Sequence, residues 1–173
     1  MLVVDGDSVA HGVLPETKAI QTWPYRVAEA LHDGVTVLAS SQSIAADCVK
    51  RLPRVYDLHP SIYLLQVGQW AQNHEPLKDF IPAIHTICWE MAVRSIGVVL
   101  ISPPHQFTVL CDDFWRYVSV LRESAQAMRL GKFVDVTDVT GLQCYDNDGS
   151  SVVCHYSPAG AEEVARRIVN AIR

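Results

Sequence analysis

A serine near the start of the chain and a histidine near its end are the side chains best placed to do chemistry together. Ser8 closes the segment Leu2-Val3-Val4-Asp5-Gly6-Asp7-Ser8, in which a short apolar stretch runs into a Gly-Asp-Ser turn. His155 stands just before the last stretch with helical periodicity. A hydroxyl becomes an effective nucleophile when a nearby base removes its proton as the new bond forms, and histidine is the usual base. The pair therefore suggests cleavage of an ester.

Both residues also have simpler interpretations. Asp7 and Ser8 are residue types that cap helices, and the tripeptide alone would favour that role. His155 could be a loop histidine bonded to the main chain. The strand-like stretch before Ser8 and the position of His155 ahead of the last helix favour a catalytic role for both.

Length and composition predict one globular domain over residues 1–173. A chain of 173 residues with 49% hydrophobic content can bury a sizeable core. No apolar run is long enough to cross a bilayer, so we expect no membrane insertion. The net charge is −5 and the basic residues are scattered, which argues against a nucleic-acid partner. No secretory leader is visible, so a cytoplasmic location is the default unless the chain is an excised domain.

The five cysteines are odd in number and irregularly spaced, which argues against a disulfide framework and fits a reducing compartment. Cys154 beside His155 invites a metal site or a cysteine nucleophile. Adjacent residues usually point apart, however, and no second ligand pair has zinc-like spacing. We therefore expect no metal.

Extended, β-branched segments alternate with segments of helical period along the whole chain. The expected strands are 2–5, 35–39, 61–67, 97–101 and 133–136. The expected helices are 23–32, 44–52, 77–95, 112–129 and 158–172, the third being regular only from about Pro82 onward, because proline breaks a helix interior. Stretches near 68–78 and 140–156 show no period. This alternation predicts an α/β fold with a parallel sheet covered on both faces.

The polar candidates follow the predicted strands. Ser8 follows the first strand, Gln42 the second, the segment 68–73 the third and His105 the fourth, while His155 follows the fifth at a distance. Ligands gather at the carboxyl ends of the strands in open parallel sheets, so we expect these residues to share one edge. Their convergence is stronger support for a site than any single motif.

With these motifs in place, the sequence resembles the SGNH (GDSL-type) hydrolase family over nearly its whole length. Gly6-Asp7-Ser8 is similar to the first block of that family, and residues 22–31 are similar to its first helix. Val98 to Ile101 followed by Ser102-Pro103-Pro104 resembles the fourth strand, and residues 155–161 resemble the last block. The resemblance implies a flavodoxin-like, three-layer α/β/α sandwich with a five-stranded parallel sheet. It also implies an esterase, lipase or carbohydrate deacetylase that needs no cofactor.

In such an enzyme Ser8 would attack the acyl carbon and His155 would accept its proton. The family places an aspartate three residues before the histidine to orient the ring, but Val152 stands there. Asp146 or Asp148 could reach in from the preceding loop, or the main-chain carbonyl of Val152 could accept the imidazole N–H. We expect the carbonyl to do so and the site to be a dyad.

The oxyanion donors also depart from the family pattern. The third block is usually Gly-x-Asn-Asp, whereas this chain has Gly68-Gln69-Trp70-Ala71. Loss of one oxyanion donor costs about 3 kcal/mol in the transition state. Gln69, Gln72 and Asn73 are local substitutes, and the second-block glycine aligns with Gln42. We expect oxyanion contacts from Ser8, Gln42 and Gln69.

The remaining polar and aromatic residues of this edge are candidates for binding substrate, namely Asp7, Gly68, Trp70, Asn73 and His105. The absence of a long lid favours a small-molecule or carbohydrate ester carrying O-acetyl groups. A binding module with decayed catalysis is the alternative from another class. A flavodoxin-like nucleotide or flavin binder ranks last, because the first loop has one glycine before the serine and no phosphate cradle.

Overall fold

The computed structural model describes residues 1–11, 21–105, 113–147 and 151–173. Residues 72, 73, 142–147 and 151–154 are described by their main chain alone.

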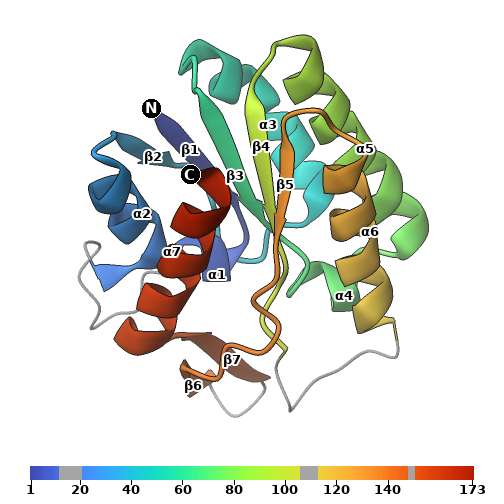
Figure 1. Cartoon of the computed structure of the whole chain (residues 1–173). Coiled ribbons are helices and arrows are strands. Elements are labelled where there is room, and N and C mark those ends of the chain that lie inside the picture. The colour runs from blue at the N-terminus through green and yellow to red at the C-terminus, as the bar shows by residue number, and fades with distance from the viewer. Residues whose placement is uncertain (12–20, 106–112, 148–150) are drawn as a thin grey trace.

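A five-stranded parallel sheet forms the centre of the molecule (Figure 1). Its strands are β1 (Leu2–Gly6), β2 (Val35–Val37), β3 (Ile62–Gln66), β4 (Gly97–Ile101) and β5 (Gly131–Val134). They lie in the order β2-β1-β3-β4-β5, so the strand order reverses between β1 and β3. In parallel sheets such a reversal opens a crevice at the carboxyl ends of the strands, which is where ligands bind.

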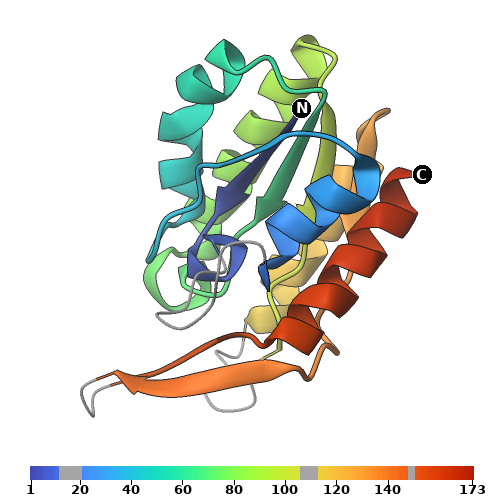
Figure 2. The same cartoon turned by 90° about the vertical axis from the view of Figure 1, so that its left-hand side faces the viewer.

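Helices cover both faces of the sheet, which Figure 2 shows from its side. One layer contains α3 (Ala45–Asp57), α5 (Leu77–Val93) and α6 (Phe114–Gln126), and the other contains α2 (Trp23–Leu31) and α7 (Pro158–Ile172). Alternate strand residues enter the two cores: Val3 and Leu65 pack toward α3 and α5, whereas Val4 and Leu64 pack toward α2 and α7. The three-layer α/β/α sandwich with five parallel strands is thus confirmed.

Several smaller elements were not predicted. The short helices α1 (Ser8–His11) and α4 (Ala71–His74) follow β1 and β3 directly. The stretch 140–156 contains an antiparallel hairpin of β6 (Leu142–Asn147) and β7 (Ser151–Tyr156). Figure 1 shows α1, α4 and this hairpin at the carboxyl end of the sheet.

Prolines account for two incorrect helix boundaries. α5 begins at Leu77 and continues through Pro82, and α3 continues through Pro53 to Asp57. Pro82 removes only the N–H that would bond to the carbonyl of Lys78, which is an exposed residue whose carbonyl water can reach. Apolar packing of the rest of each helix outweighs the lost hydrogen bond. The last strand is also displaced, since β5 begins at Gly131 and not at 133.

Within the described ranges, no helix combines the length and the apolar character that a bilayer crossing requires.

Gly6 should be the least replaceable residue of β1. Its φ is +138°, and a Cβ there would lie 1.8 Å from the carbonyl oxygen of Gln66. We therefore expect Gly6→Ala to lower the free energy of unfolding by about 3 kcal/mol or more, measured by urea denaturation. Gly34→Ala is the matched control because a Cβ there meets nothing within 4 Å, and we expect a change within about 0.5 kcal/mol. Equal effects of the two substitutions would contradict this packing argument.

Candidate active site at the carboxyl edge of the sheet

The turn after β1 presents Ser8 as the first residue of α1. The N–H of Asp7 donates to the carbonyl of Gln66 at 3.2 Å, which turns the chain off the sheet, and the N–H of His11 donates to the carbonyl of Asp7 at 3.0 Å. Ser8 is half-buried, and its hydroxyl makes no hydrogen bond within the described residues. Asp7 caps α1, since its carboxylate accepts the N–H of Val9 at 3.0 Å. Ser8 is therefore left available for another role.

The Asp7 carboxylate joins the turn after β1 to the loop after β3. It also accepts the N–H of Gln69 at 3.2 Å, and the N–H groups of Gly68 and Trp70 contribute to its stabilisation. Burial raises the pKa of Asp7 to about 6, against the lowering effect of these N–H groups. Asp7 was expected to contact substrate, but its side chain is only 1% exposed and its oxygens serve the main chain. Gly68, expected in the same role, is buried with φ +131° and shapes the loop.

A second turn, residues 40–43, lies beside the first. The N–H of Ser40 donates to the carbonyl of Gly6 at 3.1 Å, and the N–H of Ser43 donates to the carbonyl of Ser40 at 3.3 Å. Between them, Gln42 has φ +61°, in the left-handed region that favours glycine. Gln42 is the residue that aligns with the second-block glycine. Its side chain is exposed, and its backbone has the left-handed conformation that glycine favours.

A buried ion pair supports both turns from below. Asp5 is fully buried, and its Oδ1 lies 2.6 Å from Nη2 of Arg51, while the hydroxyl of Tyr63 donates to Oδ2 at 2.9 Å. The Arg51 guanidinium also donates to the hydroxyl of Ser43 at 3.1 Å and to the carbonyl of Gly6 at 3.4 Å. Loss of the Arg51 charge would leave the carboxylate of Asp5 buried without its cation, which costs about 3–5 kcal/mol.

The third loop, after β3, is fixed at its far end by Glu75. Its carboxylate accepts the N–H groups of Ala45 and Ala46 at 2.8 and 3.0 Å, so it caps α3 from a distant part of the chain. Burial raises the pKa of Glu75. At the near end, Trp70 stacks on His74 with ring centroids 3.8 Å apart and planes 4° apart. The loop is therefore held at its far end by Glu75 and at its near end by the stack of Trp70 on His74.

His155 lies near the end of β7, and α1 packs against that strand. The ring is 9% exposed, and its pKa is lowered from the usual 6.5, mainly by burial and further by the nearby charge of His11. His11 closes the helix that Ser8 begins. The neutral imidazole, which is the form that can accept a proton, is thereby favoured.

Nothing in the described residues orients the His155 ring through Nδ1. This atom is buried and has no hydrogen-bond partner, so the carbonyl of Val152 does not accept from it as expected. Val152 lies opposite Asp146 in the β6–β7 hairpin. The Asp146 side chain and the whole of Asp148 lie outside the described residues.

Other expected contacts are placed as follows. The ring of His105 stacks on that of Trp115, with centroids 5.3 Å apart, so His105 belongs to an aromatic group at the start of α6. Its main-chain N–H donates to the carbonyl of Thr137. The N–H of Gln69 is taken by Asp7, which leaves only its side chain as an oxyanion donor. The Asn73 side chain lies outside the described residues.

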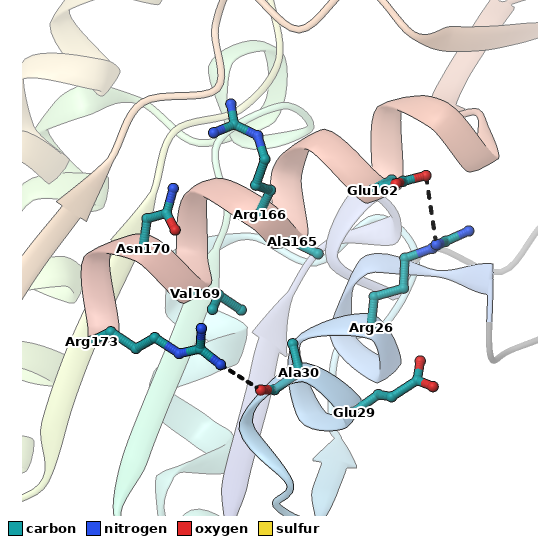
Figure 3. A pocket seen from close by; sticks show the side chains of 9 residues that line it. All are labelled: Arg26, Glu29, Ala30, Glu162, Ala165, Arg166, Val169, Asn170 and Arg173. Carbon is teal, nitrogen blue, oxygen red and sulfur yellow. Dashed lines mark hydrogen bonds and ion pairs between the residues drawn. The ribbon is translucent and has the colours of Figure 1, made fainter.

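A hollow of about 440 Å³ between α2 and α7 is unrelated to these residues (Figure 3). Small side chains such as Ala30 and Ala165 form its floor, and Arg26 faces Glu162 across it at 3.9 Å. None of the expected site residues lines it.

Sequence reasoning missed the supporting residues Arg51, Gln66, Glu75 and His11. Two signals could have found some of them. Asp5 in an otherwise apolar strand requires a buried cation, and Gln66 closing the apolar run of β3 requires buried partners. Arg51 and Glu75 lie 46 and 30 residues from their partners and carry no local signal.

Comparison with known proteins places this arrangement in a wider context. No family model matches the sequence, and no curated protein matches it. Among solved structures, a protein assigned to the G-D-S-L lipolytic family from Desulfitobacterium hafniense superposes with a TM-score of 0.82 at 16% identity, covering 98% of both chains. The chain has the SGNH hydrolase fold. An Axe2 catalytic mutant, an acetylxylan esterase from Geobacillus stearothermophilus, superposes on 99% of this chain and 93% of its own with a TM-score of 0.74 at 19% identity.

The SGNH hydrolase fold also relates the chain to the psychrotrophic esterase EstA from Pseudoalteromonas sp. The TM-score is 0.69 at 11% identity, over 99% of this chain and 95% of that one. These neighbours align with this chain over 93–98% of their own length, so the likeness extends to the whole of the fold.

The buried carboxylate of Asp7 should leave a signature in the pH dependence of stability. A pKa of about 6 in the folded protein, against 3.8 in the unfolded chain, means that the folded state holds the proton more tightly. The Asp7 contribution to stability is therefore present below pH 3.8 and lost as the pH rises through about 6. We expect the free energy of unfolding of wild type, minus that of Asp7→Asn, to fall by about 3 kcal/mol across this range.

Asp33→Asn serves as the control. The pKa of Asp33 is lowered by the amino terminus, so the corresponding difference should rise with pH near its usual pKa. A difference for Asp7 that stays flat, or that follows the sign of Asp33, would contradict the assignment.

Proposed function

We propose that the protein is a serine ester hydrolase in which Ser8 is the nucleophile and His155 the general base. The observation that carries the proposal is the buried, neutral-favouring imidazole of His155 on a strand that packs against the helix beginning with Ser8. The Ser8 hydroxyl, which has no hydrogen bond to any of the described residues, and the turn that holds it at the carboxyl edge support the same assignment. The SGNH hydrolase fold is consistent with it.

The reaction would proceed by acyl transfer. Ser8 Oγ attacks the acyl carbon while His155 accepts the hydroxyl proton, and the imidazolium then gives that proton to the departing alcohol. Water, activated by the same imidazole, releases the acid from the acyl-enzyme. The N–H groups of Ser8 and Gln42 would donate to the oxyanion, and the left-handed backbone at Gln42 supports this use of the second turn.

We propose that the substrate is the ester of a small acyl group, namely an acetyl ester of a carbohydrate. The stacked rings of Trp70 and His74 lie on the loop that Asp7 ties to the nucleophile turn, and His74 is exposed. Aromatic faces suit the C–H surfaces of sugars. The acetylxylan esterase with the same fold removes acetyl groups from such a polymer.

A binding module that has lost catalysis is the second candidate. Two observations favour it: Trp70 stands where the third block usually supplies an asparagine, and Nδ1 of His155 has no partner within the described residues. Loss of one oxyanion donor alone costs about a hundredfold in rate, which would leave a slow enzyme and not an inert one.

Covalent labelling separates the two candidates. We expect a fluorophosphonate probe to label wild type and Ser119→Ala equally, and Ser8→Ala not at all, because the probe reacts with an activated serine. With p-nitrophenyl acetate, Ser8→Ala and His155→Ala should each lower kcat by about a thousandfold or more. Wild type that neither labels nor exceeds these variants in turnover would exclude the hydrolase and leave the binding module.

The pH dependence of turnover should report the environment of His155. Catalysis requires the neutral ring, whose pKa lies below 6.5, so the acid limb of kcat/KM should have its midpoint below pH 6.5. His11→Asn removes the neighbouring imidazole that lowers the His155 pKa and should move that midpoint upward. His59→Asn, an exposed position with φ +47° that asparagine tolerates, is the control and should leave it in place. A midpoint unaffected by His11→Asn would contradict the proximity of the two rings.

A further inference from the structure

We propose that Gln66 is a positioning residue that sets the distance between the nucleophile and the general base. This inference rests on the proposed function. Gln66 is the last residue of β3, is 1% exposed, and joins through its main chain and its side chain the two segments that carry Ser8 and His155.

The main chain of Gln66 fixes the nucleophile turn. Gln66 is opposite Gly6 in the β1–β3 register, and its carbonyl accepts the N–H of Asp7 at 3.2 Å. The carbonyl also occupies the space that a side chain at Gly6 would need. The start of α1, and with it Ser8, is therefore located by the position of Gln66.

The side chain of Gln66 fixes the strand that carries the base. Its Nε2 donates to the hydroxyl of Tyr156 at 2.9 Å and to the carbonyl of Ser102 at 3.0 Å. Both hydrogens of the amide are thereby used, which defines the plane of the group. Tyr156 is 4% exposed and follows His155 directly, so its hydroxyl ties the end of β7 to the ends of β3 and β4.

This tie matters because the imidazole lacks the usual means of orientation. Within the described residues, Nδ1 of His155 has no acceptor that would hold the ring. Consecutive residues of a strand point to opposite sides and their Cα atoms are about 3.8 Å apart, so an anchor at Tyr156 constrains His155 closely. β6 and β7 pair with each other in a separate two-stranded sheet, and among the described side chains it is Tyr156 that bonds this hairpin to the central sheet.

The test is a double-mutant cycle with p-nitrophenyl acetate. Tyr156→Phe removes the acceptor, and Gln66→Met removes the donor with little change in side-chain volume. Each variant should lower kcat by about ten- to a hundredfold, the range expected when a reacting group is misplaced. KM should stay within about threefold, since the ground-state contacts to substrate are unchanged. The double variant should be within about twofold of the worse single one, because both substitutions remove the same bond.

Tyr117→Phe is the matched control. Tyr117 is also buried and donates its hydroxyl to the carbonyl of Glu75 at 2.5 Å, but it belongs to the core under α3 and α5, whereas Tyr156 belongs to the core on the other face of the sheet. This variant should lower the melting temperature comparably while kcat changes less than about twofold. Equal losses of kcat in the control, or losses that multiply in the double variant, would overturn the inference.

A measurement without turnover keeps the inference separate from the proposed function. Nitrogen-15 NMR of the histidine rings should show altered ring shifts and an altered titration midpoint for His155 in both Tyr156→Phe and Gln66→Met, and no change in Tyr117→Phe. If wild type proves inactive toward esters, the proposed function fails while this comparison still decides the role of Gln66. Ring signals of His155 identical to those of wild type would overturn it.

Discussion

The close approach of β1 to β3 at Gly6 and Gln66 is the constraint on which the rest of the site depends. The two main chains are near enough that the carbonyl of Gln66 fills the volume a side chain would require. The strand therefore ends abruptly, and the next three residues can leave the sheet in a single turn. A Gly-Asp-Ser sequence satisfies this geometry residue by residue: glycine for the close approach, aspartate for the hydrogen bonds, and serine for the half-buried first position of α1.

Three buried carboxylates hold the turns around this point in place. Asp5 pairs with Arg51, Asp7 accepts main-chain N–H groups from its own turn and from the third loop, and Glu75 caps α3. Each carboxylate joins segments that are distant in the sequence. An ion pair or main-chain N–H groups replace the water that each one loses on burial. Preorganisation of this kind places donors and reacting groups before substrate arrives, which is the main source of electrostatic stabilisation in acyl transfer.

The sequence predicted the layered architecture well because its signals are local. Continuous apolar runs identified β3 and β4, and β4 was predicted with its bounds, 97–101. The helix at 158–172 was also predicted with its bounds, since Ser157 caps it and Pro158 begins it. Prolines misled the prediction of α3 and α5, because tertiary packing outweighed the loss of one hydrogen bond. The β6–β7 hairpin was missed because its pattern is weak.

The reacting residues of the candidate site could be predicted from the sequence, whereas most of the residues that hold them in place could not. Ser8 and His155 could be proposed from motifs, and the left-handed backbone at Gln42 fits its alignment with a glycine. Arg51, Glu75 and the bond from Gln66 to Tyr156 depend on long-range contacts that no local pattern encodes. A crystal structure of the protein treated with an alkyl fluorophosphonate, whose fluoride Ser8 Oγ would displace, would test the pairing of serine and histidine most directly. It should show phosphorus bonded to Ser8 Oγ, its oxygen facing the N–H groups of Ser8 and Gln42, and His155 Nε2 within hydrogen-bond reach. An unmodified Ser8, or an imidazole turned away from the adduct, would contradict it.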